Sequence, residues 1–124
     1  MLNRIKNEVV LRMKDFAASD PRMKIVGVFN PGVALLGDEI VLLVRVAESP
    51  KEQREGYLAA TQVSVRRGKP SYRIEHHKKP CPLLPHISHF EVVRMSRDGY
   101  RVLSIQKRPD LFGANENENH GIED

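Results

Sequence analysis

The sequence predicts an all-β fold in which short strands are joined by tight turns. Short runs of β-branched and aromatic residues recur along the chain, and such residues favour strands. Two of the gaps between these runs contain Gly37-Asp38 and Asp98-Gly99, which are typical of hairpin turns. The acidic tail, Lys107–Asp124, lacks a strand pattern. We therefore expect antiparallel strands over most of the chain before that tail.

The N-terminal region is compatible with either a short helix or a short strand. The run Val9-Val10-Leu11 suits a strand. A helix face is indicated by four apolar residues at spacings of four, four and three: Ile5, Val9, Met13 and Phe16. Either element leads to Asp20-Pro21, where the proline disfavours helix at the residue before it.

The stretch from Met23 to Val46 predicts a strand, a turn and a hairpin. Ile25–Phe29 consists largely of strand-forming residues, and Asn30-Pro31-Gly32 is typical of a turn. Val33–Leu36 and Glu39–Val46 are then expected to pair around Gly37-Asp38 as a hairpin.

Arg45 is the unusual residue of this stretch, because it stands between Val44 and Val46 in an apolar strand. A guanidinium in such a place is unfavourable unless an anion or a polar cavity receives it. Arg45 therefore suggests a binding or catalytic site, but the chemistry of a guanidinium alone does not identify the kind of site.

Residues 48–56 and 76–89 are expected to be irregular loops. The first contains the polar stretch Ser49–Gly56, and the second contains Pro80, Pro82 and Pro85. Proline donates no backbone hydrogen bond, so three prolines in so short a stretch disfavour regular structure.

Further strands are expected between and after these loops. Tyr57–Val65 has a strand pattern, Arg66–Pro70 is a basic turn, and Tyr72–Glu75 suits a short strand. Phe90–Met95 and Tyr100–Ile105 are expected to form a second hairpin. A total of about seven short strands joined by tight turns is typical of propellers, sandwiches and barrels.

Length and composition indicate a single globular domain. A chain of 124 residues can bury a core, and no apolar run approaches the ~18 residues of a membrane span. The N-terminus is too charged for a secretion signal, and the single Cys81 excludes an internal disulfide and fits a reducing cytoplasm. The net charge of +4, with both signs interspersed, indicates a solvated surface.

Five potential metal ligands lie within residues 76–89: His76, His77, Cys81, His86 and His89. Their spacing matches no zinc pattern of paired cysteines and histidines. Incidental histidines in a proline-rich surface loop are the favoured interpretation, so neither a metal nor a cofactor is assigned.

A second group of residues is basic, and Tyr57 and Tyr72 nearby would offer rings for base stacking. The basic residues are Arg66, Arg67, Lys69, Arg73, Lys78 and Lys79. Without a recognisable nucleic-acid-binding motif, a charged loop is favoured. A non-catalytic β module that binds an anionic partner through this loop stays as an alternative function.

Three segments in order resemble the N-terminal part of glycoside hydrolase family 130, the mannoside phosphorylases and related mannosidases. Val28–Val33 and Leu42–Val46 resemble the family's Phe-Asn-Pro-Gly start and its Leu-Leu-x-Arg-Val strand, with a similar separation. Val93–Tyr100 resembles its Ser-x-Asp-Gly hairpin, and Glu116–Asp124 its Glu-x-x-Gly-x-Glu-Asp segment. The middle, Ala47–His89, is longer and more basic than the family pattern.

The resemblance implies a five-bladed β-propeller with its active site in the central cavity. Members cleave β-mannosides, many by inverting phosphorolysis that releases mannose 1-phosphate. Residues 1–124 are then expected to be the incomplete N-terminal part of one propeller domain, covering about the first blade and the entry to the second, and inactive alone. The expected partner is an oligosaccharide, with neither membrane nor nucleic acid, and a homo-oligomer is left open.

The resemblance also implies roles for four residues. Asp124 matches the family's general acid, and Glu123 beside it is an implied substrate contact. Asn30 and Arg45 match the asparagine and arginine that hold the sugar in the −1 subsite. Phosphorolysis needs only one carboxylate, since phosphate is already an anionic nucleophile, whereas inverting hydrolysis needs a second to activate water. The family's phosphate-binding residues lie further along the chain, so hydrolysis stays an alternative, and inorganic phosphate is the co-substrate of phosphorolysis.

Overall fold

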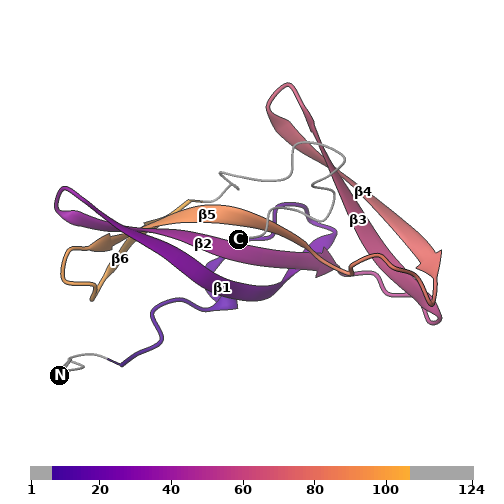
Figure 1. Ribbon diagram of the computed structural model, residues 1–124, viewed down its shortest axis with the longest axis horizontal. Helices are drawn as coiled ribbons and strands as arrows, with labels where there is room; N and C mark the ends of the chain where they lie inside the picture. The colour runs from indigo at the N-terminus through magenta and orange to yellow at the C-terminus, as the bar shows by residue number, and fades with distance from the viewer. Residues whose placement is uncertain (1–6, 107–124) are drawn as a thin grey trace.

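The computed structural model of the chain describes residues 7–106 and confirms the all-β prediction (Figure 1). One short 3-10 helix, η1 (Met13–Asp15), precedes the strands. The described part of the chain contains six strands: β1 (Met23–Leu36), β2 (Glu39–Pro50), β3 (Tyr57–Arg66), β4 (Lys69–Lys78), β5 (Ile87–Ser96) and β6 (Val102–Ile105).

The strands form two antiparallel sheets. The larger sheet has the order β1-β2-β5-β6, so β1 is one edge and the long β2 and β5 are central. The β3–β4 hairpin is inserted between β2 and β5 as a separate two-stranded sheet, and Figure 1 shows it leaving one end of the larger sheet. The two hairpins expected around Gly37-Asp38 and Asp98-Gly99 are therefore confirmed, as parts of one sheet.

The turn predicted at Asn30-Pro31-Gly32 is wrong, because β1 continues through these residues as a bulged strand. Phe29 pairs with Arg45 and Gly32 pairs with Leu43, so that Asn30 and Pro31 together oppose a single residue of β2. Proline is tolerated here because β1 is an edge strand and a bulge leaves one backbone position unpaired. A second shift, between Ile25 and Gly27, bulges the same strand again.

The predicted loop boundaries at 48–56 and 76–89 also need correction. Strand β2 continues to Pro50, and β4, which was expected to end at Glu75, continues to Lys78. Strand β5 begins at Ile87, so the proline-rich irregular segment is only residues 79–86. The residues that were expected to be loop but belong to strands each pair with a residue of a neighbouring strand. Examples are Glu48 with Ile87 and His76 with Ala59.

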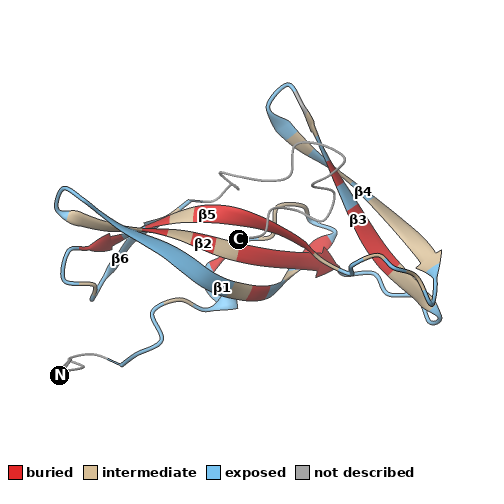
Figure 2. Cartoon of the chain, in the orientation of Figure 1, coloured by how far each residue is buried: buried red, intermediate tan, exposed pale blue. Residues whose placement is uncertain are grey.

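Two clusters of packed apolar side chains stabilise the sheets. The larger covers one face of the β1-β2-β5-β6 sheet and consists of Phe16, Leu42, Val44, Val46, Val93 and Met95. The smaller joins the β3–β4 hairpin to the larger sheet through Met23, Val63 and Ile87. Figure 2 shows the buried positions concentrated in β2, β3 and β5, whereas most of β1 is exposed.

The N-terminal region does not form the predicted helix face. Residues 7–12 form neither helix nor strand, and only η1 is helical in this region. Of the proposed face, Phe16 is buried in the larger cluster, while Val9 and Met13 are exposed, and Ile5 lies outside the described residues. No helix among residues 7–106 is long and apolar enough to cross a membrane.

Candidate functional site

Arg45 is accommodated because it lies on the opposite sheet face from its apolar neighbours. Successive side chains of a strand point to opposite faces. Val44 and Val46 therefore pack into the larger apolar cluster, while Arg45 between them lies half-buried on the other face. The charge does not enter the core, so the desolvation penalty that made this residue unusual is avoided.

On that face Arg45 contacts residues from both neighbouring strands. Its partners in the ladder are Phe29 of β1 and Phe90 of β5. Arg45 Cζ lies 5.8 Å from the centroid of the Phe29 ring, a cation–π distance, and Arg45 Nε donates to Ser88 Oγ over 3.3 Å. A guanidinium held between an aromatic ring and a hydroxyl is suited to a polar or anionic ligand.

Asn30 lies at the bulge immediately after Phe29. Its φ of 37° is in the left-handed region, which asparagine adopts more readily than most residues, and its side chain is exposed. The ladder places it one residue beyond the Phe29–Arg45 pair, on an edge strand that is open to a ligand. The two residues predicted to hold the sugar, Asn30 and Arg45, are therefore near each other along the paired strands β1 and β2.

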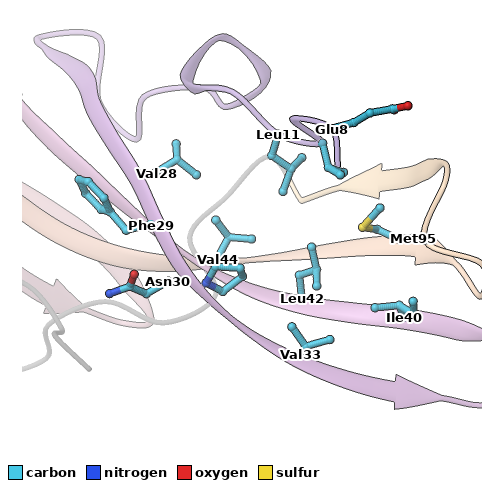
Figure 3. A pocket seen from close by; sticks show the side chains of 13 residues that line it. Glu8, Leu11, Val28, Phe29, Asn30, Val33, Ile40, Leu42, Val44 and Met95 are labelled. Carbon is cyan, nitrogen blue, oxygen red and sulfur yellow. The ribbon is translucent and has the colours of Figure 1, made fainter. Parts of the chain in front are cut away.

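A hollow of about 500 Å³ lies on the other face of the sheet (Figure 3). Leu11 from the N-terminal segment faces Leu42, Val44 and Met95 from the sheet, and Phe29 and Asn30 at the β1 bulge also line the hollow. The lining is mainly aliphatic, and it includes Asn30 but not Arg45, whose side chain lies on the opposite face of the sheet. The hollow therefore does not contain both of the predicted sugar contacts. We therefore take the Phe29–Asn30–Arg45 group, rather than the hollow, as the candidate site.

Sequence reasoning missed a buried polar cluster formed by Ser19, Glu48, His89 and Glu91. Glu48 accepts hydrogen bonds from Ser19 N (2.9 Å) and Ser19 Oγ (2.8 Å). His89 Nε2 lies 3.1 Å from Glu91 Oε1 and 3.7 Å from Glu48 Oε1. Among the described residues, His89 Nδ1 and Glu91 Oε2 have no hydrogen-bond partner. The alternation of His89, Glu91 and Val93 on one face of a strand was the signal that could have revealed the cluster.

Burial raises the pKa of Glu48 above its usual value, although His89 and the Ser19 hydrogen bonds act in the opposite direction. Burial also raises the pKa of Tyr72, which packs against the smaller apolar cluster. The polar cluster lies on the face of Val44 and Val46, away from Arg45. Its part in the fold is to tie the segment before β1 to the central strands.

The predicted metal-ligand candidates are dispersed. His76 and His77 are successive residues of β4 and so point to opposite faces, His89 is buried beside Glu91, and Cys81 and His86 belong to the segment 79–86. Within residues 7–106, no group of three or more histidine, cysteine or acidic side chains is arranged to hold a metal ion.

The basic residues lie along the β3–β4 hairpin, but the proposed stacking rings are engaged elsewhere. Arg67 is in the turn and exposed, and Arg73 forms a 2.7 Å ion pair with Glu75. Tyr72 packs against the smaller apolar cluster, and the Tyr57 ring has Arg54 Cζ 4.2 Å from its centroid. This arrangement does not offer the pair of open rings expected of a single-strand nucleic-acid binder.

The implied general acid, Asp124, and the implied substrate contact, Glu123, lie outside the described residues. Their assignment stays a prediction from the resemblance, as does the position of that segment relative to Asn30 and Arg45.

Comparisons with known proteins bear on the fold. No protein-family model matches the chain, and neither does any curated protein. Among solved structures, the chain is similar to a β-1,2-mannobiose phosphorylase from Listeria innocua in complex with β-1,2-mannobiose. The superposition has a TM-score of 0.73 at 21% sequence identity, and it covers 90% of this chain but 36% of that one. The likeness to mannoside phosphorylases noted from the sequence is thereby confirmed at the level of the fold: this chain has the fold of one part of such an enzyme.

Proposed function

We propose that the chain belongs to a carbohydrate-active enzyme that cleaves β-mannosides, with an oligosaccharide as substrate. The observation that carries the proposal is the fold likeness to a mannobiose phosphorylase, which spans 90% of this chain. Two further observations support it: Arg45 of β2 pairs with Phe29 of β1, and Asn30 follows Phe29 at the β1 bulge. The chain spans about a third, 36%, of the length of the solved enzyme, so the proposal concerns a longer protein.

The proposed architecture is a five-bladed propeller, of which the described sheet is one blade. Propeller blades are four-stranded antiparallel sheets, and β1, β2, β5 and β6 form such a sheet. In this arrangement residues 1–124 belong to a single propeller domain, and the β3–β4 hairpin is an insertion between the second and third strands of the blade. A cytoplasmic location is part of the same proposal, and homo-oligomer formation stays open.

The proposed reaction is inverting phosphorolysis of a β-mannoside. Asp124 protonates the leaving glycosidic oxygen, phosphate attacks the anomeric carbon from the opposite side, and mannose 1-phosphate is released. Asn30, Arg45 and Glu123 hold the sugar hydroxyls, for which asparagine offers both a donor and an acceptor. Inorganic phosphate is a co-substrate, and no other cofactor is proposed. Hydrolysis by the same scaffold is the alternative.

The test is turnover of β-1,2-mannobiose by the full-length protein, with and without inorganic phosphate. Phosphate-dependent release of mannose 1-phosphate is expected. Release of free mannose at a rate independent of phosphate would instead support hydrolysis. Asp124→Asn should lower turnover by about 10²-fold or more, since a general acid contributes at least that much. Asp38→Asn is the matched control, because Asp38 is exposed and pairs with Arg97 at the surface. Equal activity of the two variants would remove Asp124 from the acid role.

A further inference from the structure

The bulge at Asn30-Pro31 decides which face of the sheet Phe29 occupies. Beyond the bulge, Val33 pairs with Leu42 on the face of the larger apolar cluster. Without the extra residue, Phe29 would follow the same alternation and point to that face too, because a one-residue shift exchanges the two faces of a strand. With it, Phe29 pairs with Arg45. The bulge therefore moves a large aromatic ring from the apolar face to the face of the candidate site.

Gly27 provides the space in which the Phe29 ring lies. A Cβ atom built on Gly27 would be 1.9 Å from Phe29 Cζ and less than 3.0 Å from both Cε atoms. The ring thus lies across the backbone of Gly27, and any side chain at this position would displace it. The ring is held by this contact although 44% of the residue is exposed on an edge strand.

Ser88 holds the guanidinium from the other side. It lies on β5, two pairs along the ladder from Phe90 and therefore on the same face of the sheet, and is only 1% exposed. Its Oγ accepts the hydrogen bond from Arg45 Nε. A buried hydroxyl has few alternative partners, so this hydrogen bond restricts the orientation of the guanidinium more than a solvent-exposed one would.

We propose that Phe29 and Ser88 are positioning residues that fix the Arg45 guanidinium in one orientation for a sugar ligand, and that Gly27 seats the ring. A long arginine side chain loses rotamer freedom when it binds a ligand, and a protein that restricts it beforehand binds more tightly. This inference rests on the proposed function in one respect, namely that Arg45 contacts the substrate.

The experiment measures kcat and KM for β-1,2-mannobiose and, separately, the NMR signal of the Arg45 Nε–Hε group in the full-length protein. The signal is identified by its loss in Arg45→Lys. Phe29→Leu and Gly27→Ala should lower kcat/KM by about tenfold and move the signal, because the ring current of Phe29 acts on this group. Phe29→Tyr keeps the aromatic face, and it should leave both readouts close to those of the unsubstituted protein.

Gly32→Ala is the matched control for Gly27→Ala. Gly32 lies on the same strand, but a Cβ there would be 3.8 Å from its nearest neighbour, which is an ordinary contact. Ser88→Ala removes the hydroxyl with little change of volume, and it should also lower kcat/KM and move the signal.

The outcomes separate the two proposals. If Arg45→Lys lowers kcat/KM while Phe29→Leu and Ser88→Ala leave it and the NMR signal unchanged, the positioning role is overturned and the sugar contact stands. If Arg45→Lys has normal kcat/KM, the proposed contact between Arg45 and substrate fails, and this inference fails with it. Equal effects of Gly27→Ala and Gly32→Ala would overturn the role of Gly27.

Discussion

Glu48 and His89 lie side by side in the interior, with Glu48 Oε1 3.7 Å from His89 Nε2. The two residues are only 0% and 2% exposed, so this ionisable pair is shielded from water. They come from adjacent strands, and Ser19 donates two hydrogen bonds to the Glu48 carboxylate. Buried ionisable groups make stability depend on pH, because their proton affinity differs between the folded and unfolded states. Two of the predictions below concern this cluster.

The first prediction is that ionisation of the Glu48 carboxyl lowers the free energy of unfolding as the pH rises. Burial raises the pKa of Glu48 in the folded protein above its ordinary value of 4.5. The stability that the protonated carboxyl contributes is therefore present below that value and is lost as pH rises through the raised folded pKa. The free energy of unfolding of the unsubstituted protein, minus that of Glu48→Gln, should fall from about pH 4.5 upward.

Urea denaturation at a series of pH values measures this difference. Glu52→Gln is the control, because Glu52 is an exposed residue outside the strands. Its difference curve should stay flat over the same range. A flat curve for Glu48→Gln as well would contradict the assigned direction of the pKa.

The second prediction is that the Ser19 hydroxyl stabilises the fold. Ser19→Ala removes the 2.8 Å hydrogen bond to Glu48 Oε2 and leaves a buried carboxylate oxygen without that donor. Loss of a hydrogen bond to a charged group lowers the free energy of unfolding by about 1 to 3 kcal/mol. Urea denaturation checks this, and Ser64→Ala, at an exposed position of β3, should change stability by less than about 0.5 kcal/mol. Similar values for the two variants would show that the contact contributes little.

The third prediction concerns the backbone of Asn30. Its φ of 37° suits glycine and asparagine, whereas alanine in the left-handed region is less stable by about 1 kcal/mol. Asn30→Gly should therefore be close to the unsubstituted protein in stability, and Asn30→Ala should be lower by about that amount. Thermal unfolding of the two variants compares them directly. An alanine variant as stable as the glycine variant would mean that the bulge does not require this φ.

The fourth prediction is that Met23 links the β3–β4 hairpin to the larger sheet. Met23 is 0% exposed and packs with Val63 and Ile87, one residue from each sheet. Met23→Ala should lower the free energy of unfolding by about 2 to 5 kcal/mol, because it leaves a cavity. Met13→Ala is the matched control, since Met13 is 50% exposed, and it should stay within about 0.5 kcal/mol. Equal losses in the two variants would contradict the packing of Met23.

The hairpins at Gly37-Asp38 and Asp98-Gly99 were predictable, because both signals are local. Gly37 and Gly99 have φ values of 59° and 73°, which glycine adopts without strain. The triplet Asn30-Pro31-Gly32 carried an equally local turn signal, and there the prediction was wrong. The same residue types serve a turn and an edge bulge, and only the pairing with β2 distinguishes the two.

The candidate site could be predicted in part. Arg45 was conspicuous because a charge interrupts an apolar run, and Asn30 followed from the family resemblance. Neither observation indicated that Phe29 and Ser88 contact Arg45. Ser88 reaches Arg45 only because β5, more than forty residues further along the chain, pairs with β2 across the inserted hairpin.

The order of residues was sufficient to predict the all-β class, the two tight hairpins and the position of Arg45 in a strand. These features depend on residue propensities and on the alternation of side chains within a few residues. The tertiary structure alone decided which face each side chain occupies and which polar groups are buried. Both depend on strand register and on pairing between distant segments, which bring Phe29 to Arg45 and Ser19 to Glu48.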